Sequence, residues 1–378
     1  MSKAEVHGRC DEKFAAVRAA FEANFTSGAD TGASFAVTVN GETVVDLWGG
    51  FKDEAGTQPW EEDTIVNVYS TTKTMCALTA LLCADRGLID FAAPVATYWP
   101  EFAQNGKEKV TVGHLMSHSA GLSGFDKKIE TEELYDWDHV CRLLAAQAPW
   151  WEPGTRSGYH AVTQGYLVGE VVRRVTGKSL GTVFREEIAE PLNADFHIGL
   201  PPSADARMGD LIPPATSLGE ATPGGDIAKR TFGSVTMTAL EPRTRPWRRA
   251  EIPAAGGIGN ARSVAKVQAI LANDGVAAGR RFLSAAGARK ALELQIDNTD
   301  LVLGIPVRFG LGYGLKSEMM PLPTENAMFW GGWGGSLIVV DYDAKATFSY
   351  VMNRMVSTTT GDGRVGGLLF GAYGALMS

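Results

Sequence analysis

Strand-forming sequence lies at both ends of this chain, and a helix-rich region lies between them. Near the N-terminus, residues 34–39 and 43–48 are two β-rich runs joined by Asn40-Gly41, which is a strong hairpin signal. Runs with strand character return near the C-terminus at 307–315, 327–330, 336–342 and 347–353. Strands at both ends that enclose helices predict an α+β fold with one antiparallel sheet built from the two termini.

The helical region is predicted to form a unit inserted into this sheet domain. We assign residues 1–90 and 295–378 to a discontinuous sheet domain and residues 91–294 to a mostly helical domain. Segment 201–253 is rich in Pro, Gly, Thr and Arg and has little periodicity, which predicts a long loop of the kind that forms lids or cleft walls. Periodicity and end signals predict helices at 11–25, 70–86, 111–117, 132–148, 160–175, 180–189, 261–273, 284–294 and 364–376.

Composition narrows the range of partners. The 378 residues carry a formal net charge of −8, which argues against a nucleic-acid partner. No N-terminal apolar leader and no run of about 18 apolar residues occurs, so we expect a cytoplasmic protein without a membrane partner. Four cysteines lack C-x-x-C spacing and are expected to be buried reduced thiols: Cys10, Cys76, Cys83 and Cys141. No pattern in the sequence indicates the oligomeric state.

Ser70 and Lys73 stand three residues apart where a long apolar run begins. On a helix these positions share one face, so the lysine amine can reach the serine hydroxyl. A serine hydroxyl needs a neighbouring base to become a nucleophile, and a lysine serves when desolvation lowers its pKa. The pattern S-x-x-K alone carries little information, because Ser70 could equally be a helix N-cap and Lys73 a solvated first-turn residue.

Two distant segments have the character of a substrate cleft. Tyr159 follows the turn 153–155 and precedes a helix, a position from which a side chain can point into a cleft. Near a lysine cation its phenol would ionise more easily. Residues 329–336 form a glycine-rich strand edge, where a substrate can approach backbone N–H groups. Taken singly, Tyr159 also fits a core tyrosine, and the glycine run a β-bulge.

In order and spacing, these pieces resemble the three motifs of the penicillin-recognising serine hydrolases. That group comprises class C β-lactamases, DD-peptidases and the β-lactamase-like family VIII carboxylesterases. The motifs are S-x-x-K at Ser70, a tyrosine after P-G-T at Tyr159, and W-G-G at Trp330. Further stretches look like family landmarks, at 114–122, 177–180, 256–258 and 309–314. The resemblance covers nearly the whole chain and implies a β-lactamase/transpeptidase-like fold, with the active site between the two domains.

The resemblance also implies roles for individual residues. Ser70 would be the acylated nucleophile, and Lys73 and Tyr159 would handle the proton. Which of these two takes the serine proton stays open, because strongly interacting groups titrate as a pair. The backbone N–H groups of Ser70 and Trp333 would form the oxyanion hole. We expect no cofactor and no metal ion.

Trp330 departs from the usual pattern of the group. Together with Gly331 and Gly332 it is expected to bind substrate, and with Trp333 to line the pocket. Lactamases and peptidases of the group usually place a lysine or histidine at this position, and that cation helps to hold the substrate carboxylate. Tryptophan offers an apolar face and one N–H donor. We therefore expect a serine carboxylesterase that hydrolyses small, short-chain acyl esters through an acyl-Ser70 intermediate.

Three other activities or roles are compatible with the fold. An acyltransferase would pass the acyl group to an alcohol, and a β-lactamase or DD-peptidase would cleave an amide. A non-catalytic binding protein would have no physical reason to retain a buried lysine.

Two further patterns are predicted to be structural. Gly177-Lys178-Ser179-Leu180-Gly181 matches G-x-S-x-G, but a helix precedes it, so Ser179 is expected to cap the next helix. His114 and His118 have a metal-like spacing without the H-E-x-x-H glutamate, which predicts a structural pair.

Overall fold

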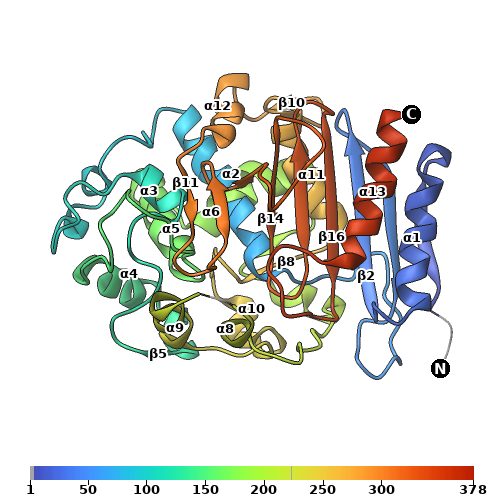
Figure 1. Cartoon of the computed structure of the whole chain (residues 1–378), viewed down its shortest axis with the longest axis horizontal. Coiled ribbons are helices and arrows are strands. Elements are labelled where there is room, and N and C mark those ends of the chain that lie inside the picture. Colours follow the sequence, from blue (N-terminus) through green and yellow to red (C-terminus); the bar gives the residue numbers. More distant parts are fainter. Residues whose placement is uncertain (1–3, 223) are drawn as a thin grey trace.

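A nine-stranded antiparallel sheet organises the computed structural model, which describes residues 4–222 and 224–378. Strands from the two ends of the chain lie side by side, since β2 pairs with β16 (Figure 1). In spatial order the strands are β1 (Val6–Cys10), β3 (Glu42–Gly50), β2 (Gly32–Val39), β16 (Ala346–Met352), β15 (Leu337–Asp341), β14 (Ala327–Gly331), β13 (Gly314–Leu315), β12 (Pro306–Phe309) and β11 (Ile296–Thr299). The predicted α+β class and the sheet built from both termini are confirmed.

Helices cover both faces of this sheet. On β16, Phe348 packs on Tyr373 of α13 (Gly363–Met377), with ring centroids 4.5 Å apart. The neighbouring Thr347 hydroxyl donates to the Ala265 carbonyl of α11 (Ala261–Ala272) at 3.1 Å. Successive strand residues point to opposite faces, so α13 covers one face and α11 the other. All seven residues of β16 are accordingly buried.

Helix α2 (Thr72–Asp85) is the buried centre of the helical region. Each of its residues from Thr72 to Cys83 is buried, and it packs against α5 (Thr163–Thr176). The other helices are α1 (Ala15–Thr26), α3 (Val112–Met116), α4 (Trp137–Ala146), α6 (Leu180–Phe184), α7 (Glu190–Leu192), α8 (Leu218–Ala221), α9 (Asp226–Gly233), α10 (Arg245–Arg249) and α12 (Ala285–Arg289). A helix without a polar face needs such full enclosure.

Small sheets connect the helical region to the large one. β4 (Val66–Asn67), β8 (Gly257–Gly259) and β6 (His197–Ile198) form a three-stranded sheet next to the start of α2. β5 (Ile129–Glu130) pairs with β7 (Val235–Thr236), and β9 (Val276–Ala277) pairs with β10 (Arg280–Arg281). The small sheet with β4 fixes the entry of the chain into α2.

Several details differ from the sequence expectations. Strand β1 was not expected, because it is short and mostly exposed and forms only by pairing with β3. Segment 201–253, expected to be one long loop, contains α8, α9 and α10. Side chains at Ser217 and Thr244 cap two of these helices, and such short helices leave no periodicity to detect.

The division into two domains remains a prediction. Helix α11 comes from the part assigned to the helical domain, yet it packs on the sheet. All four cysteines are free thiols, and Cys76, Cys83 and Cys141 are buried, as expected. Cys10, which was also expected to be buried, is only partly buried, because it ends the edge strand β1. Within the described ranges, no helix combines the length and apolar character that a membrane crossing requires.

Candidate active site

Ser70 lies in a 3-10 turn, Tyr69–Thr71, that leads directly into α2. The preceding Tyr69 has a positive φ of 43°, a conformation that costs a bulky residue on the order of 1 kcal/mol. The Tyr69 ring is held against Trp333, with centroids 5.0 Å apart. Ser70 makes no helix-capping hydrogen bond, so the N-cap interpretation is wrong.

The Lys73 amine is fully buried and reaches the Ser70 hydroxyl. Nζ lies 3.1 Å from Ser70 Oγ and 3.2 Å from Tyr159 Oη, and it donates to the carbonyls of Ala161 at 2.7 Å and Ala254 at 2.9 Å. None of these four partners is a carboxylate. Burial therefore holds the pKa of Lys73 well below its usual range and favours the neutral amine. A solvated first-turn lysine is excluded.

Tyr159 completes a three-residue cluster with Ser70 and Lys73. Its hydroxyl donates to Ser70 Oγ. Burial raises the pKa of the Tyr159 phenol. The expected easier ionisation beside a lysine cation is wrong, because burial disfavours charge on both groups.

Asp300 fixes the backbone at Tyr159 and was missed in the sequence. Its carboxylate accepts from Tyr159 N at 3.0 Å and from Ser157 Oγ at 2.8 Å. It also accepts from the backbone N–H groups of Val302 and Leu303. An aspartate that binds its own backbone two and three residues on signals an Asx turn, but nothing local indicates the partner at Tyr159.

The loop after β14 lies directly against the Ser70 turn. A side chain at Gly332 would place its Cβ 2.2 Å from the Val68 carbonyl oxygen, so only glycine permits this approach. Ser70 N–H lies at a helix N-terminus, where amides have no intrahelical acceptor. Trp333 N–H donates to no acceptor among the described residues. The two predicted oxyanion-hole donors thus lie on segments in direct contact.

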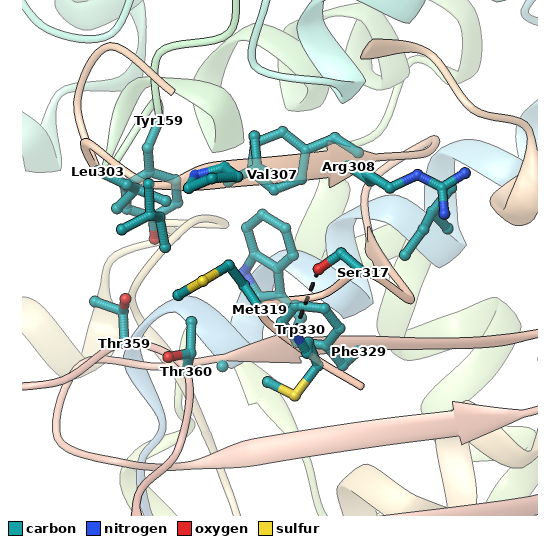
Figure 2. Close-up of a pocket in the computed structure, with 16 residues that line it drawn as sticks. Tyr159, Leu303, Val307, Arg308, Ser317, Met319, Phe329, Trp330, Thr359 and Thr360 are labelled. Atoms are coloured by element: carbon teal, nitrogen blue, oxygen red, sulfur yellow. Dashed lines mark hydrogen bonds between the residues drawn. The ribbon is translucent and has the colours of Figure 1, made fainter. Parts of the chain in front are cut away.

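Two cavities meet at Tyr159. One, with an open volume of about 910 Å³, is lined by Ser70, Trp333 and residues of segment 217–237. The other, of about 660 Å³, is lined by Trp330, Gly331 and mostly apolar side chains of 303–329. Figure 2 shows Trp330 in the middle of this second cavity, with Tyr159 at one end and Arg308 at the other. Residues 217–237, part of segment 201–253, thus form a cleft wall, which is one of the two roles that the composition of the segment predicted.

The structure separates the predicted substrate-binding residues. Trp330 and Trp333, expected to line one pocket, line different cavities. Gly331 lines the cavity of Trp330, whereas Gly332 lies against the Ser70 turn and lines neither cavity. Tyr159 is shared by both cavities.

The two histidines of the metal-like spacing form separate hydrogen bonds. His114 Nδ1 accepts from Thr111 N at 3.2 Å and completes the cap of α3. His118 Nδ1 accepts from His160 N at 3.1 Å, and the His118 ring stacks on Trp330 with centroids 5.3 Å apart. Burial holds the pKa of His118 well below its usual range. Both histidines thus have the structural role that was predicted: His114 caps α3, and His118 packs against Trp330.

Ser179 caps a helix, as predicted. Its hydroxyl oxygen accepts a hydrogen bond from Thr182 N at 3.2 Å, and its O–H donates one to the Glu251 carboxylate at 2.7 Å. Gly177 ends α5 with a φ of 71°. The G-x-S-x-G match therefore spans the end of α5 at Gly177 and the start of α6 after Ser179.

Comparison with known proteins identifies relatives over nearly the whole chain. The sequence profile of the family described as Beta-lactamase matches residues 17–368. The Esterase/beta-lactamase LipL of Mycobacterium tuberculosis is 37% identical over 372 residues, which cover 93% of this chain and 84% of LipL. A crystal structure of a family VIII carboxylesterase is 44% identical, with a TM-score of 0.93 and coverage of 98% of this chain and 100% of that one. A penicillin-binding protein homologue from Caulobacter crescentus is 39% identical, with a TM-score of 0.92 and the same coverage.

Proposed function

The chain belongs to the beta-lactamase family, as a serine hydrolase that acts on carboxylic esters, and we propose that it cleaves small, short-chain acyl esters through an acyl-Ser70 intermediate. The observation that carries this proposal is the buried cluster in which Lys73 Nζ and the Tyr159 hydroxyl both contact Ser70 Oγ. The fold is the β-lactamase/transpeptidase-like fold of its relatives.

The lowered pKa of the buried Lys73 amine supports its role as the base. A neutral amine has two N–H bonds and one lone pair. The carbonyls of Ala161 and Ala254 accept the two N–H bonds, which leaves the lone pair facing the hydroxyls of Ser70 and Tyr159. Lys73 can then accept the Ser70 proton directly or through Tyr159 as Oγ bonds to the ester carbon.

In the remaining steps Lys73 and Tyr159 give up the proton that they accepted from Ser70. The negative charge on the former carbonyl oxygen is stabilised by the N–H groups of Ser70 and Trp333. Collapse of the tetrahedral intermediate breaks the ester C–O bond, and the proton held by Lys73 and Tyr159 passes to the departing alcohol oxygen. A water molecule then attacks the acyl-Ser70 ester and gives a proton to the same pair. The second tetrahedral intermediate collapses by breaking the bond between the acyl carbon and Ser70 Oγ, which takes that proton back, and the carboxylic acid is released.

The two cavities divide the substrate between them. Because the acyl carbon bonds to Ser70, the acyl group occupies the cavity that Ser70 lines. The alcohol lies on the other side of Tyr159, which lines both cavities and stands where the leaving oxygen must be protonated. The alcohol part then lies beside Trp330.

A chain-length series of p-nitrophenyl esters tests the proposal. We expect higher kcat/KM for acetate and butyrate than for octanoate. Ser70→Ala should lower kcat/KM at least about a thousandfold, and a fluorophosphonate should label the wild type but not this variant. Ser179→Ala is the matched control, since that serine lies outside both cavities. An active Ser70→Ala variant would overturn the assignment of the nucleophile.

A second candidate activity is β-lactam hydrolysis. It is favoured by the relative LipL, which is named as both an esterase and a β-lactamase. It is disfavoured by Trp330, which stands where a carboxylate-binding cation would be expected. Nitrocefin turnover measured beside the ester series decides between them, and a kcat/KM similar to that for butyrate would make β-lactams a substrate class.

A further inference from the structure

The Trp330 indole N–H is a buried hydrogen-bond donor with no acceptor among residues 4–222 and 224–378. The residue as a whole is 5% exposed. Figure 2 shows the indole nitrogen on the side of the ring that faces the cavity interior, where Tyr159, Met319 and Thr360 lie. Buried polar groups in proteins are nearly always hydrogen-bonded, so an orphaned donor in a binding cavity points to a ligand acceptor.

The indole is held in this orientation by its surroundings. Trp330 pairs with Ile338 in the sheet, and its ring contacts the rings of His118 and Phe309, at centroid distances of 5.3 and 5.5 Å. The His118 and Phe309 rings also contact each other, with centroids 5.4 Å apart. The His118 ring lies nearly parallel to the indole, with an interplanar angle of 11°. Rotation of Trp330 toward a protein acceptor would break both contacts. The donor is therefore preorganised toward the cavity.

The walls of this cavity select against a charged partner. Around Trp330 they are mainly aliphatic, aromatic and methionine side chains, including Val307, Phe309 and Met319. Arg308, at the rim, already donates to the Lys316 carbonyl at 2.8 Å and pairs with Asp297 at 3.3 Å. A carboxylate beside a single N–H donor and apolar walls would lose far more hydration than it regains.

We propose that the alcohol part of the substrate carries a neutral oxygen acceptor, such as a ketone, ester or ether oxygen, that binds the Trp330 indole N–H. This inference rests on the proposed esterase function and narrows it to esters whose alcohol is apolar apart from that acceptor. The acceptor satisfies the buried donor, and the remainder of the alcohol packs on the apolar walls. An alcohol without the acceptor fills the same cavity but leaves the N–H unsatisfied.

Matched ester pairs test the inference. Butyrate esters of 4-acetylbenzyl and 4-isopropylbenzyl alcohol differ by a carbonyl oxygen in place of a methyl group. Those of 3-methoxypropyl and pentyl alcohol differ by an ether oxygen in place of a methylene group. In the wild-type enzyme we expect at least one acceptor ester to have a kcat/KM about tenfold above its partner, since an unsatisfied buried donor is costly. Trp330→Phe keeps an aromatic ring without the N–H and should bring that ratio close to one.

Three results would overturn the inference. They are equal kcat/KM within both pairs in the wild type, an unchanged ratio in Trp330→Phe, or a preference for the 4-carboxybenzyl ester over both neutral benzyl esters. The comparison within the wild type does not depend on the variant folding. Trp333→Phe is the matched control, since that indole lines the other cavity and its loss should leave the alcohol ratio in place. If none of these esters is hydrolysed while p-nitrophenyl butyrate is, the inference fails and the esterase proposal stands; if p-nitrophenyl butyrate is not hydrolysed either, the esterase proposal itself fails.

Discussion

The Ser336 hydroxyl donates to the Val68 carbonyl at 3.0 Å, although the two residues are 268 positions apart in the chain. The same oxygen lies 2.9 Å from Thr71 Oγ1. Val68 and Thr71 flank Ser70, and Ser336 closes the loop that carries Trp333. One hydroxyl thus fixes the separation of the two segments that supply the proposed oxyanion-hole donors.

We expect Ser336→Ala to lower kcat about tenfold and to leave KM nearly unchanged. Donors aimed at the developing oxyanion act mainly in the transition state, and a looser loop weakens them. Steady-state kinetics on p-nitrophenyl butyrate measures the change. Ser349→Ala is the control, because Ser349 is a buried strand serine without a hydrogen-bond partner among the described residues. An effect of Ser336→Ala confined to KM would contradict the positioning role.

The buried Lys73 amine predicts how activity depends on pH. Its pKa is lowered, and only the neutral amine can accept the Ser70 proton. We expect kcat/KM for a neutral ester to fall as the pH is lowered through this pKa, and Lys73→Arg, which stays charged, to lack that activity throughout. Activity that increases as the pH is lowered would contradict the role of Lys73 as base.

The same lowered pKa affects the free energy of unfolding. Between the lowered pKa in the folded protein and the ordinary value of 10.5, the unfolded chain binds one more proton at Lys73 than the folded chain. Stability therefore rises with pH in this window, with a slope of about 1.4 kcal/mol per pH unit from this residue, and falls as the pH decreases toward the folded pKa. Urea unfolding at several pH values should show that slope reduced in Lys73→Met. Equal slopes in both proteins would mean that Lys73 is charged in the folded state.

Asp300 should matter for catalysis without contacting substrate. We expect Asp300→Ala to lower kcat roughly ten- to a hundredfold, because Tyr159 loses the carboxylate that holds its backbone. Asp341→Ala is a suitable control for general damage, since Asp341 accepts three hydrogen bonds, against four for Asp300, and lines neither cavity. If the two variants lose kcat equally, the effect of Asp300 is on folding alone.

Ser179 should affect stability only. Ser179→Ala removes the cap of α6 and should lower the free energy of unfolding by about 1 kcal/mol. We expect kcat and KM to remain those of the wild type. Loss of turnover in a variant with an intact fold would show that the wrong serine has been assigned.

The features that could be predicted best from the sequence are those determined by a few neighbouring residues. The hairpin at Asn40-Gly41 needs only two residues with positive φ, and both have it. The i, i+3 spacing of Ser70 and Lys73 is a property of one helix. The middle of the chain was harder, because helices of four or five residues, such as α8 and α10, depend on caps rather than on periodicity.

Features that depend on distant contacts could not be predicted. The pairing of β1 with β3 and the bond from Asp300 to Tyr159 join segments with no shared local signal. The division of Trp330 and Trp333 between two cavities depends on how one loop turns between them. The three motifs named by the resemblance lie close together in the structure, but the resemblance gave no information on which cavity each tryptophan lines.

The pairing of β2 with β16 has a consequence for synthesis of the protein. Gly32 N donates to the side chain of Asn353, 321 residues later, so this edge of β2 stays open until nearly the whole chain has been made. At roughly 5–20 residues per second the wait is about 15–60 s. During that time β2 presents a bare apolar edge to other nascent chains. A ribosome-associated chaperone that shields the first hairpin would be expected to increase the yield of folded enzyme more than one that acts after release.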